Sequence, residues 1–334
     1  MRENIINVLK NSDKALDIYE LQDRLNIDTV EETKEFSEEL KKLEDEVIVY
    51  HSNKDKYMML ENSHLRKGIM RANKKGFGFV EVEGLDDDIY VFDAGIKFAS
   101  GNLLGIDYIM PDFTYLVKNR KRIKGLFITH GHRENMGAVA DLLKDIPELK
   151  VYATKFTKFE LMEDGVNEQN IVLIKPHRKI NFGNISIFPI AVSHSCPDSV
   201  MYVINTKDGA ICYTGDFIID PTMQGAYDMD LGKIAYVGKQ GVLCLLCESS
   251  FAEKNGHTSP NHRLVGFFED VIKHHDKRII FSVLPTHLYT IAEIFDAAAN
   301  SHRKIVLMGK RLQNVVNFSN KERYLKFNPE ILGD

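Results

Sequence analysis

The stretch Phe127-Ile-Thr-His-Gly-His-Arg-Glu-Asn-Met-Gly137 decides the fold and the chemistry expected of this chain. An apolar strand, residues 125–128, runs into a turn that carries His130 and His132, and a helix is expected from Met136 onward. Two imidazoles one residue apart, just beyond a strand end, can converge on one zinc ion without backbone strain. The alternative is that both are ordinary loop histidines.

Three further predicted strands also release a histidine or an aspartate where they end. They are residues 89–92 followed by Asp93, residues 185–192 followed by His194, and residues 210–214 followed by Asp216. In layered α/β sheets, sites form where the carboxyl ends of strands meet. We therefore expect these side chains to gather on one rim with the two turn histidines, which favours metal ligands over loop histidines.

The chain resembles the metallo-β-lactamase-type nucleases with a β-CASP insertion, specifically the ribonuclease J family. Six segments carry the resemblance, in the order and spacing of the family: FDAGIKF (92–98), LLGIDYIMPDFTYL (103–116), GLFITHGH (125–132), SHSCPDSV (193–200), YTGDF (213–217) and GVLCLLCESS (241–250). The resemblance implies an α/β chain, with the amino-terminal half of a metallo-β-lactamase αββα domain over residues 92–254 and part of a β-CASP domain over residues 255–334.

The chain departs from the family at its signature motif. The family pattern is HxHxDH, whereas this sequence reads His130-Gly-His132-Arg-Glu134-Asn135. That resembles the degenerate paralogue of bacteria with two ribonuclease J proteins, which is weakly active or inactive and pairs with an active partner. The sequence also stops at Asp334, so we expect a late histidine of the metal site and the returning half of the fold to be missing.

By resemblance, His130, His132 and His194 hold the first metal and Asp216 bridges to a second. Three imidazoles and one carboxylate suffice for a single zinc site, with Asp93 expected to orient one of the histidines. The resemblance thus predicts one zinc ion rather than two, with an empty site as the alternative.

The positions for a second metal hold Glu134 and Asn135. Glutamate can still bind a metal, but its extra methylene moves the oxygens, and a neutral amide is a poor zinc ligand. If the site retains hydrolytic activity, Asp216, His194 and Glu134 are the expected catalytic residues. Glu248 matches the acidic β-CASP motif, with a capping carboxylate as the alternative. His287 falls where the family contacts RNA phosphate, with a surface loop histidine as the alternative.

Composition sets broad limits. A chain of 334 residues at 44% hydrophobic can form two or three domains. No apolar run reaches the length of a membrane span and the start lacks a signal-peptide pattern, so we expect a cytoplasmic protein without membrane contact. Cys244 and Cys247 lie in an apolar strand-like run without a second pair, so they are expected to be buried and inert. A net charge of −5 means that any RNA contact needs a local basic patch.

Residues 1–60 are predicted to form a small winged-helix domain. Thr29 with Glu32 three residues later is a capping box for the third helix, and residues 47–50 and 56–59 are predicted to form a hairpin. Residues 30–46 carry eight acids against three lysines, which would repel a phosphate backbone. Protein docking or a spacer role is therefore favoured over DNA binding.

Residues 61–91 are basic and then aromatic. Lys74, Lys75, Phe77 and Phe79 resemble the RNA-binding strand of cold-shock and OB-type barrels, in which aromatic faces stack bases and cations follow phosphates. Residues 1–90 also resemble the amino terminus of ribonuclease R. The alternative is a hairpin of residues 76–83 with 88–92, in which the phenylalanines are core.

The remaining pattern alternates strands with helices. The helix that begins at Met136 is expected to close over 141–148, and further helices are expected at 155–163, 260–275 and 290–299. Strands are expected at 151–153, 171–174, 181–192, 199–206, 278–283 and 304–308. Five histidines are expected to be solvated: His257, His262, His274, His275 and His302. The sequence contains no GxxxxGK[ST] phosphate loop, which argues against an NTPase.

Three functional hypotheses follow. The first is an RNA-processing protein of the ribonuclease J type, weakly active or inactive alone, which works as a homo-oligomer or beside an active paralogue. The second is an RNA-binding adaptor without catalysis. The third is a true phosphodiesterase. The number of bound metal ions distinguishes them.

Overall fold

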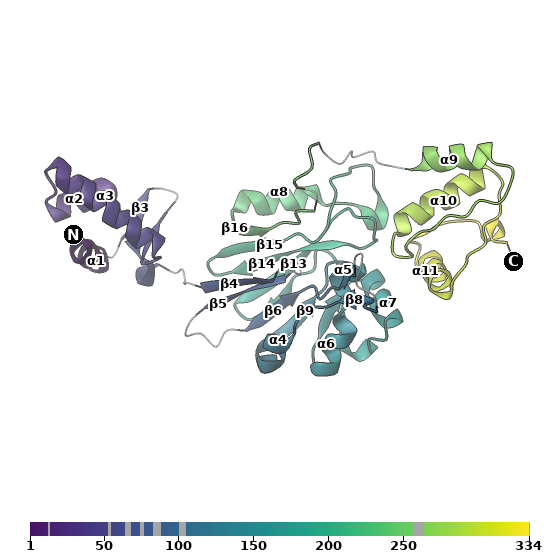
Figure 1. The fold of residues 1–334 in the computed structure, drawn as a ribbon, viewed down its shortest axis with the longest axis horizontal. Coiled ribbons are helices and arrows are strands. Elements are labelled where there is room, and N and C mark those ends of the chain that lie inside the picture. The colour runs from purple at the N-terminus through teal and green to yellow at the C-terminus, as the bar shows by residue number, and fades with distance from the viewer. Residues whose placement is uncertain are drawn as a thin grey trace. The chain divides into compact units, whose positions relative to one another are not determined.

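A computed structural model describes residues 1–12, 14–52, 55–63, 68–73, 77–82, 88–99, 105–250, 252–256 and 264–333, with the backbone alone for 68–73 and 77–82. The chain is mixed α/β with several sheets (Figure 1). It divides into two compact units, one of residues 1–73 with 78–87 and the other of residues 88–334 with 74–77.

The first unit contains three helices and a small sheet. Its elements are α1 (Arg2–Lys10), β1 (Leu16–Asp17), α2 (Ile18–Leu25), α3 (Val30–Asp45), β2 (Val49–His51) and β3 (Lys56–Met59), and the strand order is β1-β3-β2. Thr29 accepts from the backbone of Glu32 while Glu32 caps Thr29 in return, so the predicted capping box is confirmed. Apolar residues of all three helices, such as Ile5, Leu21 and Phe36, form one fully buried core.

Strands β4 (Gly68–Asn73) and β5 (Phe77–Val82) pair with each other in a two-stranded sheet. The predicted hairpin of residues 76–83 with 88–92 is therefore wrong. The described partner of β5 in its sheet is β4, whereas β6 (Ile89–Phe92) pairs in parallel with a strand of another sheet.

A four-stranded parallel sheet in the second unit carries the first candidate ligands. Its order is β11 (Ile171–Leu173), β10 (Val151–Ala153), β9 (Ile123–Phe127) and β6. In a parallel sheet the carboxyl ends of neighbouring strands meet at one edge. Asp93 after β6 and His130 after β9 consequently lie beside each other, and the Asp93 backbone amide donates to the Phe127 carbonyl at 3.0 Å.

A five-stranded sheet carries the remaining ligands. Its order is β12 (Ile180–Phe182), β13 (Ile185–Ala191), β14 (Val200–Thr206), β15 (Gly209–Tyr213) and β16 (Val242–Leu246), antiparallel except for β15 with β16. The single strand predicted over 181–192 is instead a hairpin, because Gly183 adopts a positive φ of 62° between β12 and β13. A short antiparallel pair, β7 (Lys97–Phe98) with β8 (Tyr108–Ile109), stands apart from both sheets.

The two sheets enclose an aromatic core. Phe127 of β9 and Tyr202 of β14 are fully buried in it. The opposite face of the five-stranded sheet packs against α8 (Leu231–Gln240) through Ile234 and Val237. Helices α4 (Thr114–Lys118) and α6 (Val139–Asp145) lie on the other side of the layers in Figure 1. Helices α5 (Arg133–Met136) and α7 (Lys155–Glu163) flank the histidine turn.

The carboxyl-terminal segment contains α9 (Val265–His274), α10 (Leu288–Asn300) and α11 (Lys310–Lys321). The strands predicted at 278–283 and 304–308 are not formed, and the described residues there make a single bridge, between Ile305 and Leu332. These apolar segments have no neighbouring strand among the described residues with which to form a ladder of hydrogen bonds. Ile280 and Met308 are accordingly 81% and 80% exposed.

The prediction that Cys244 and Cys247 are buried is wrong, because both thiols are exposed. Strand β16 is an edge strand of its sheet, and all five of its residues are exposed. Burial of an apolar strand requires cover on its faces, which the described residues do not supply there. Among the described helices, none combines the length and apolar character needed to span a membrane.

Candidate metal centre

Three imidazoles converge at the shared edge of the two sheets. His132 Nδ1 lies 3.2 Å from His130 Nε2 and 3.1 Å from His194 Nε2. Tetrahedral zinc with Zn–N bonds near 2.0–2.1 Å separates its ligand nitrogens by about 3.3 Å. Two of the three nitrogen–nitrogen distances are thus at the spacing of ligands around one metal ion. All three ligand atoms lie within 4.8 Å of one another, and they form the candidate metal-ligand group of the described residues.

The environment keeps these imidazoles neutral. His130 and His132 are buried, and burial together with the neighbouring rings lowers the pKa of His132 to about 3. Burial, with the charge of His287, lowers the pKa of His194 to about 4. Metal ions bind the deprotonated ring nitrogen, so this donor set is ready for a cation at neutral pH. Three neutral imidazoles whose ligand atoms lie within 4.8 Å of one another suit a zinc-type ion.

The backbone around the turn is fixed from both sheets. The Tyr202 hydroxyl on β14 donates to the Ile128 carbonyl at 2.7 Å, and the Val200 amide donates to the Thr129 carbonyl at 3.0 Å. Gly131 between the two histidines is closely packed, since a Cβ there would lie 3.3 Å from Glu160 Cγ and 3.4 Å from Cys196 Sγ. This packing restrains the turn that carries His130 and His132.

Asp93 orients the site through an intermediary, rather than by direct contact with a histidine as expected. Its carboxylate accepts from the Thr129 amide at 2.8 Å and from the Thr129 hydroxyl, and that hydroxyl lies 3.0 Å from His130 Nδ1. The Tyr213 hydroxyl donates to the same carboxylate at 3.0 Å. Burial raises the pKa of Asp93 to about 6, against the opposing effect of these donors. A relay of this kind fixes the imidazole tautomer and ring orientation.

Asn135 faces this carboxylate and not the histidines. Its Nδ2 atom donates to Asp93 Oδ2 at 3.0 Å, and its Oδ1 atom is buried without a hydrogen-bond partner. Glu134 beside it is exposed. The two residues at the second-metal positions therefore point in different directions, and neither belongs to the group of three converging ligand atoms.

Asp216 borders the triad on its open side. Its Oδ2 atom lies 3.7 Å from His130 Nε2. Burial, followed by the negative charges of Glu248 and Glu134, raises the pKa of Asp216. The Glu248 carboxylate accepts from the Ser250 amide at 2.8 Å, and the Glu248 amide donates to the Thr214 hydroxyl. Asp216 thus lies within electrostatic range of two further carboxylates.

His287 at the start of α10 is a neighbour of the triad. Its ring centroid lies 4.9 Å from that of His132, and burial lowers its pKa while the charge of Glu134 opposes that shift. The family resemblance implies a phosphate contact here, with a loop histidine as the alternative, and no periodic pattern points to His132 as its neighbour. The structure makes His287 half-buried beside the candidate metal centre.

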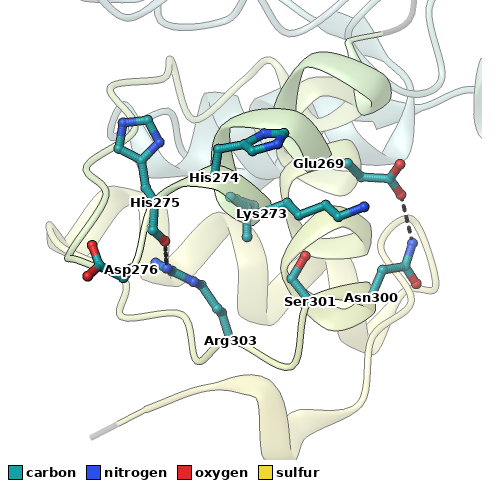
Figure 2. Close-up of a pocket in the computed structure, with 9 residues that line it drawn as sticks. Glu269, Lys273, His274, His275, Asp276, Asn300, Ser301 and Arg303 are labelled. Carbon is teal, nitrogen blue, oxygen red and sulfur yellow. Dashed lines mark hydrogen bonds between the residues drawn. The ribbon is translucent and has the colours of Figure 1, made fainter.

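Two further groups of residues concern other parts of the chain. Lys74 and Lys75 fall outside the described residues, and Phe77 and Phe79 are on β5, whose side chains are not described. A pocket of about 640 Å³ lies between the carboxyl-terminal ends of α9 and α10 and contains none of the predicted site residues (Figure 2). Its Arg303 donates to the carbonyls of His275 and Lys277, so its positive charge compensates a helix end.

Similarity to curated proteins identifies the family. The chain is 36% identical over 253 residues to ribonuclease J2 of Bacillus subtilis, an alignment that covers 74% of this chain and 45% of that protein. It is 31% identical over 264 residues to ribonuclease J 2 of Staphylococcus epidermidis and of Staphylococcus aureus, covering 77% of this chain and 46% of each. The chain belongs to the ribonuclease J family. It spans about half the length of these relatives. The family is metal-dependent, and the buried histidine cluster could bind a metal.

Two other comparisons concern parts of the fold. The family model described as the ribonuclease B OB domain matches residues 68–99, the region that includes β4 and β5. A crystal structure of a protein of unknown function from Enterococcus faecalis has a similar fold, with a TM-score of 0.50 at 16% sequence identity. That similarity covers 77% of this chain and 70% of the other.

Proposed function

We propose that this ribonuclease J family chain is an RNA-processing protein with a single metal ion held by His130, His132 and His194. The observation that carries the proposal is the spacing of their three nitrogen atoms, 3.1 and 3.2 Å from His132 Nδ1. A zinc-type ion bound there would act as a Lewis acid toward a phosphate oxygen or lower the pKa of a water molecule. Asp216 is the proposed carboxylate neighbour of that ion.

We further propose that hydrolysis by this chain alone is weak or absent. Two-metal phosphodiester cleavage requires a second ion to brace the leaving oxygen. The Asn135 side-chain amide donates its hydrogen bond to Asp93. Glu134 is exposed, and its side chain is one methylene longer than that of aspartate. At the positions that the family motif gives to the second ion, Glu134 and Asp216 are the donors left, which is few for zinc.

RNA binding is proposed for two regions. The match of residues 68–99 to an OB domain supports the basic and aromatic strand, with Lys74, Lys75, Phe77 and Phe79 as its contacts. Next to the metal centre, His287 is the proposed phosphate contact, because it is half-buried beside His132. We propose a cytoplasmic location, metallo-β-lactamase and β-CASP portions in the second unit, and a winged helix in the first.

An adaptor role without catalysis is the second candidate. The acidic α3 disfavours contact with nucleic-acid phosphates and suits a protein surface, such as a second copy or an active paralogue. In this case RNA binding would come from the basic strand alone, and the histidine cluster would serve stability.

The test combines cleavage with binding. We expect the zinc-loaded chain to degrade a 5′-monophosphorylated RNA slowly or not at all, and an active paralogue to supply the missing activity. Lys74→Ala with Lys75→Ala should weaken RNA binding and reduce its salt dependence. Processive degradation by the chain alone would contradict the weak-activity proposal, and unchanged RNA binding would exclude the basic strand.

A further inference from the structure

A buried carboxylate packs against the turn that carries His130 and His132. Glu160 on α7 is fully buried, and its Oε1 atom has no hydrogen-bond partner. Gly131, between two of the proposed ligands, packs so closely on Glu160 Cγ that a Cβ would lie 3.3 Å away. The charge of Glu160 is balanced by Arg311 of α11, which donates to Glu160 Oε2. A buried carboxylate without such a partner is strongly unfavourable.

Arg311 is also linked to the turn through a carboxylate that it shares with Arg133. Arg311 Nη1 donates to Asp164 Oδ1 at 3.0 Å. Arg133, the residue directly after His132, donates to the same carboxylate oxygen at 3.3 Å. Asp164 thus joins an arginine of the metal-binding loop to an arginine of the carboxyl-terminal segment.

The loop that carries His194 also packs against the carboxyl-terminal segment of α10 and α11. Cys196, two residues after His194, is fully buried in one core with Leu288 of α10 and Val315 of α11. The Tyr289 amide of α10 donates to the Ser195 carbonyl at 3.3 Å. Both ligand-bearing loops are therefore supported from one side by the segment that contains α10 and α11.

We propose that Arg311 is a positioning residue for the metal centre, which couples docking of the α10–α11 segment to metal affinity. The inference rests on the proposed metal site. Without Arg311, Glu160 must take up a proton or draw in water, and either change displaces the surface on which Gly131 packs. Arg133 would also lose the fixed position of its Asp164 partner. The spacing of the imidazole nitrogens would then relax.

The test measures Co²⁺ affinity from its visible absorption, and Zn²⁺ affinity by competition, in the full chain. Arg311→Met should weaken binding about tenfold, the scale of residues that orient metal ligands. Asn314→Ala is the matched control, because it removes an α11 to α7 bond of 2.9 Å to Glu163 without touching Glu160 or Asp164. It should leave affinity within about twofold, since loss of one exposed bond is a small effect.

A second pair of variants separates positioning from general unfolding. Arg311→Lys keeps the charge, so affinity should fall less than in Arg311→Met. Glu160→Gln combined with Arg311→Met removes both charges and should recover stability and much of the affinity. Wild-type affinity in a folded Arg311→Met chain, an equal loss in Asn314→Ala, or absence of recovery in the double variant would each overturn the inference.

Hydrogen exchange in the metal-free chain distinguishes this inference from the proposed function. Arg311→Met should accelerate exchange of amides in residues 129–136, whereas Asn314→Ala should not. If the wild-type chain binds no metal, the proposed function fails and the exchange result still decides the positioning role. Unchanged exchange in Arg311→Met would overturn that role.

Discussion

The side chain of Asn135 donates a 3.0 Å hydrogen bond to Asp93, and both residues are buried beside the histidine cluster. Asp93 also accepts from Thr129 and Tyr213, so donors from three different segments meet on its carboxylate. At this position the family motif has a metal-binding histidine, whereas here the amide stabilises the loop. We interpret the substitution as an exchange of a second metal ligand for a structural hydrogen bond.

Asn135→Ala should therefore destabilise the metal-free chain. Loss of this bond leaves a buried carboxylate with one donor fewer, which costs about 1–3 kcal/mol. Urea unfolding measures the change. Glu134→Gln, one residue earlier and exposed, should stay within about 0.5 kcal/mol of wild type. Equal stabilities of Asn135→Ala and wild type would show that the hydrogen bond has no structural role.

Gly95→Ala should disrupt the loop that carries the second-metal positions. A Cβ at Gly95 would lie 1.5 Å from the Glu134 carbonyl oxygen, a backbone atom, so the two segments cannot keep their present distance. Overpacking of this kind costs about 1–3 kcal/mol or more. Thermal unfolding should show the loss, and zinc affinity should fall with it. Gly238→Ala, which has open space around it, provides the control.

Acid should destabilise the metal-free chain through its histidines. Folding lowers the pKa of His194 from its ordinary 6.5 to about 4. Between these two pH values the imidazole is protonated in the unfolded chain and neutral in the folded chain, so acid favours unfolding. This contribution to stability is complete above pH 6.5 and is lost as pH falls toward 4. At pH 5 the stability lost through His194 amounts to about 2 kcal/mol.

Urea titrations at pH 7 and pH 5 test this sign in wild type and in His194→Gln. The variant should lose less stability than wild type over that interval. Asp93, whose pKa is raised to about 6, acts in the opposite direction, because protonation stabilises its buried form as pH falls. Only the difference between the two proteins therefore reports on the histidine. A steeper loss in the variant would mean that His194 is not held neutral.

Zinc affinity should change little between pH 7.5 and pH 6. An unperturbed imidazole would be about three-quarters protonated at pH 6 and would compete for the metal. His132, with a pKa near 3, has no proton to release in that range. Isothermal titration in two buffers of different ionisation enthalpy would detect proton release. Release of one or more protons per zinc ion at pH 6 would contradict the proposed neutral cluster.

The convergence of the histidines could be predicted because it follows from strand ends in a layered sheet. Asp93 and His130 follow neighbouring parallel strands, and His194 follows β13 of the facing sheet. The pairing of β5 with β4 was missed, although the three residues between them, Lys74-Lys75-Gly76, include a glycine and are a local hairpin signal. The predicted strand at 278–283 failed because apolar β-branched residues indicate a strand only when a neighbouring ladder exists.

The roles of Arg311 and His287 could not be predicted from the sequence. Arg311 meets Glu160 across 151 residues, and neither lies in a motif with recognisable spacing. The sequence also could not predict where the Asn135 amide points, because a side chain at a ligand position can turn toward a buried carboxylate instead of a metal. Such contacts depend on tertiary packing, whereas His130 and His132 are adjacent through local geometry alone.

The most direct test of the central claim is the number of zinc ions per chain, measured by native mass spectrometry after zinc loading and removal of free metal. We expect one ion per chain, absent from a variant with His130, His132 and His194 replaced by alanine. Two ions per chain, or one ion retained without these histidines, would contradict the account.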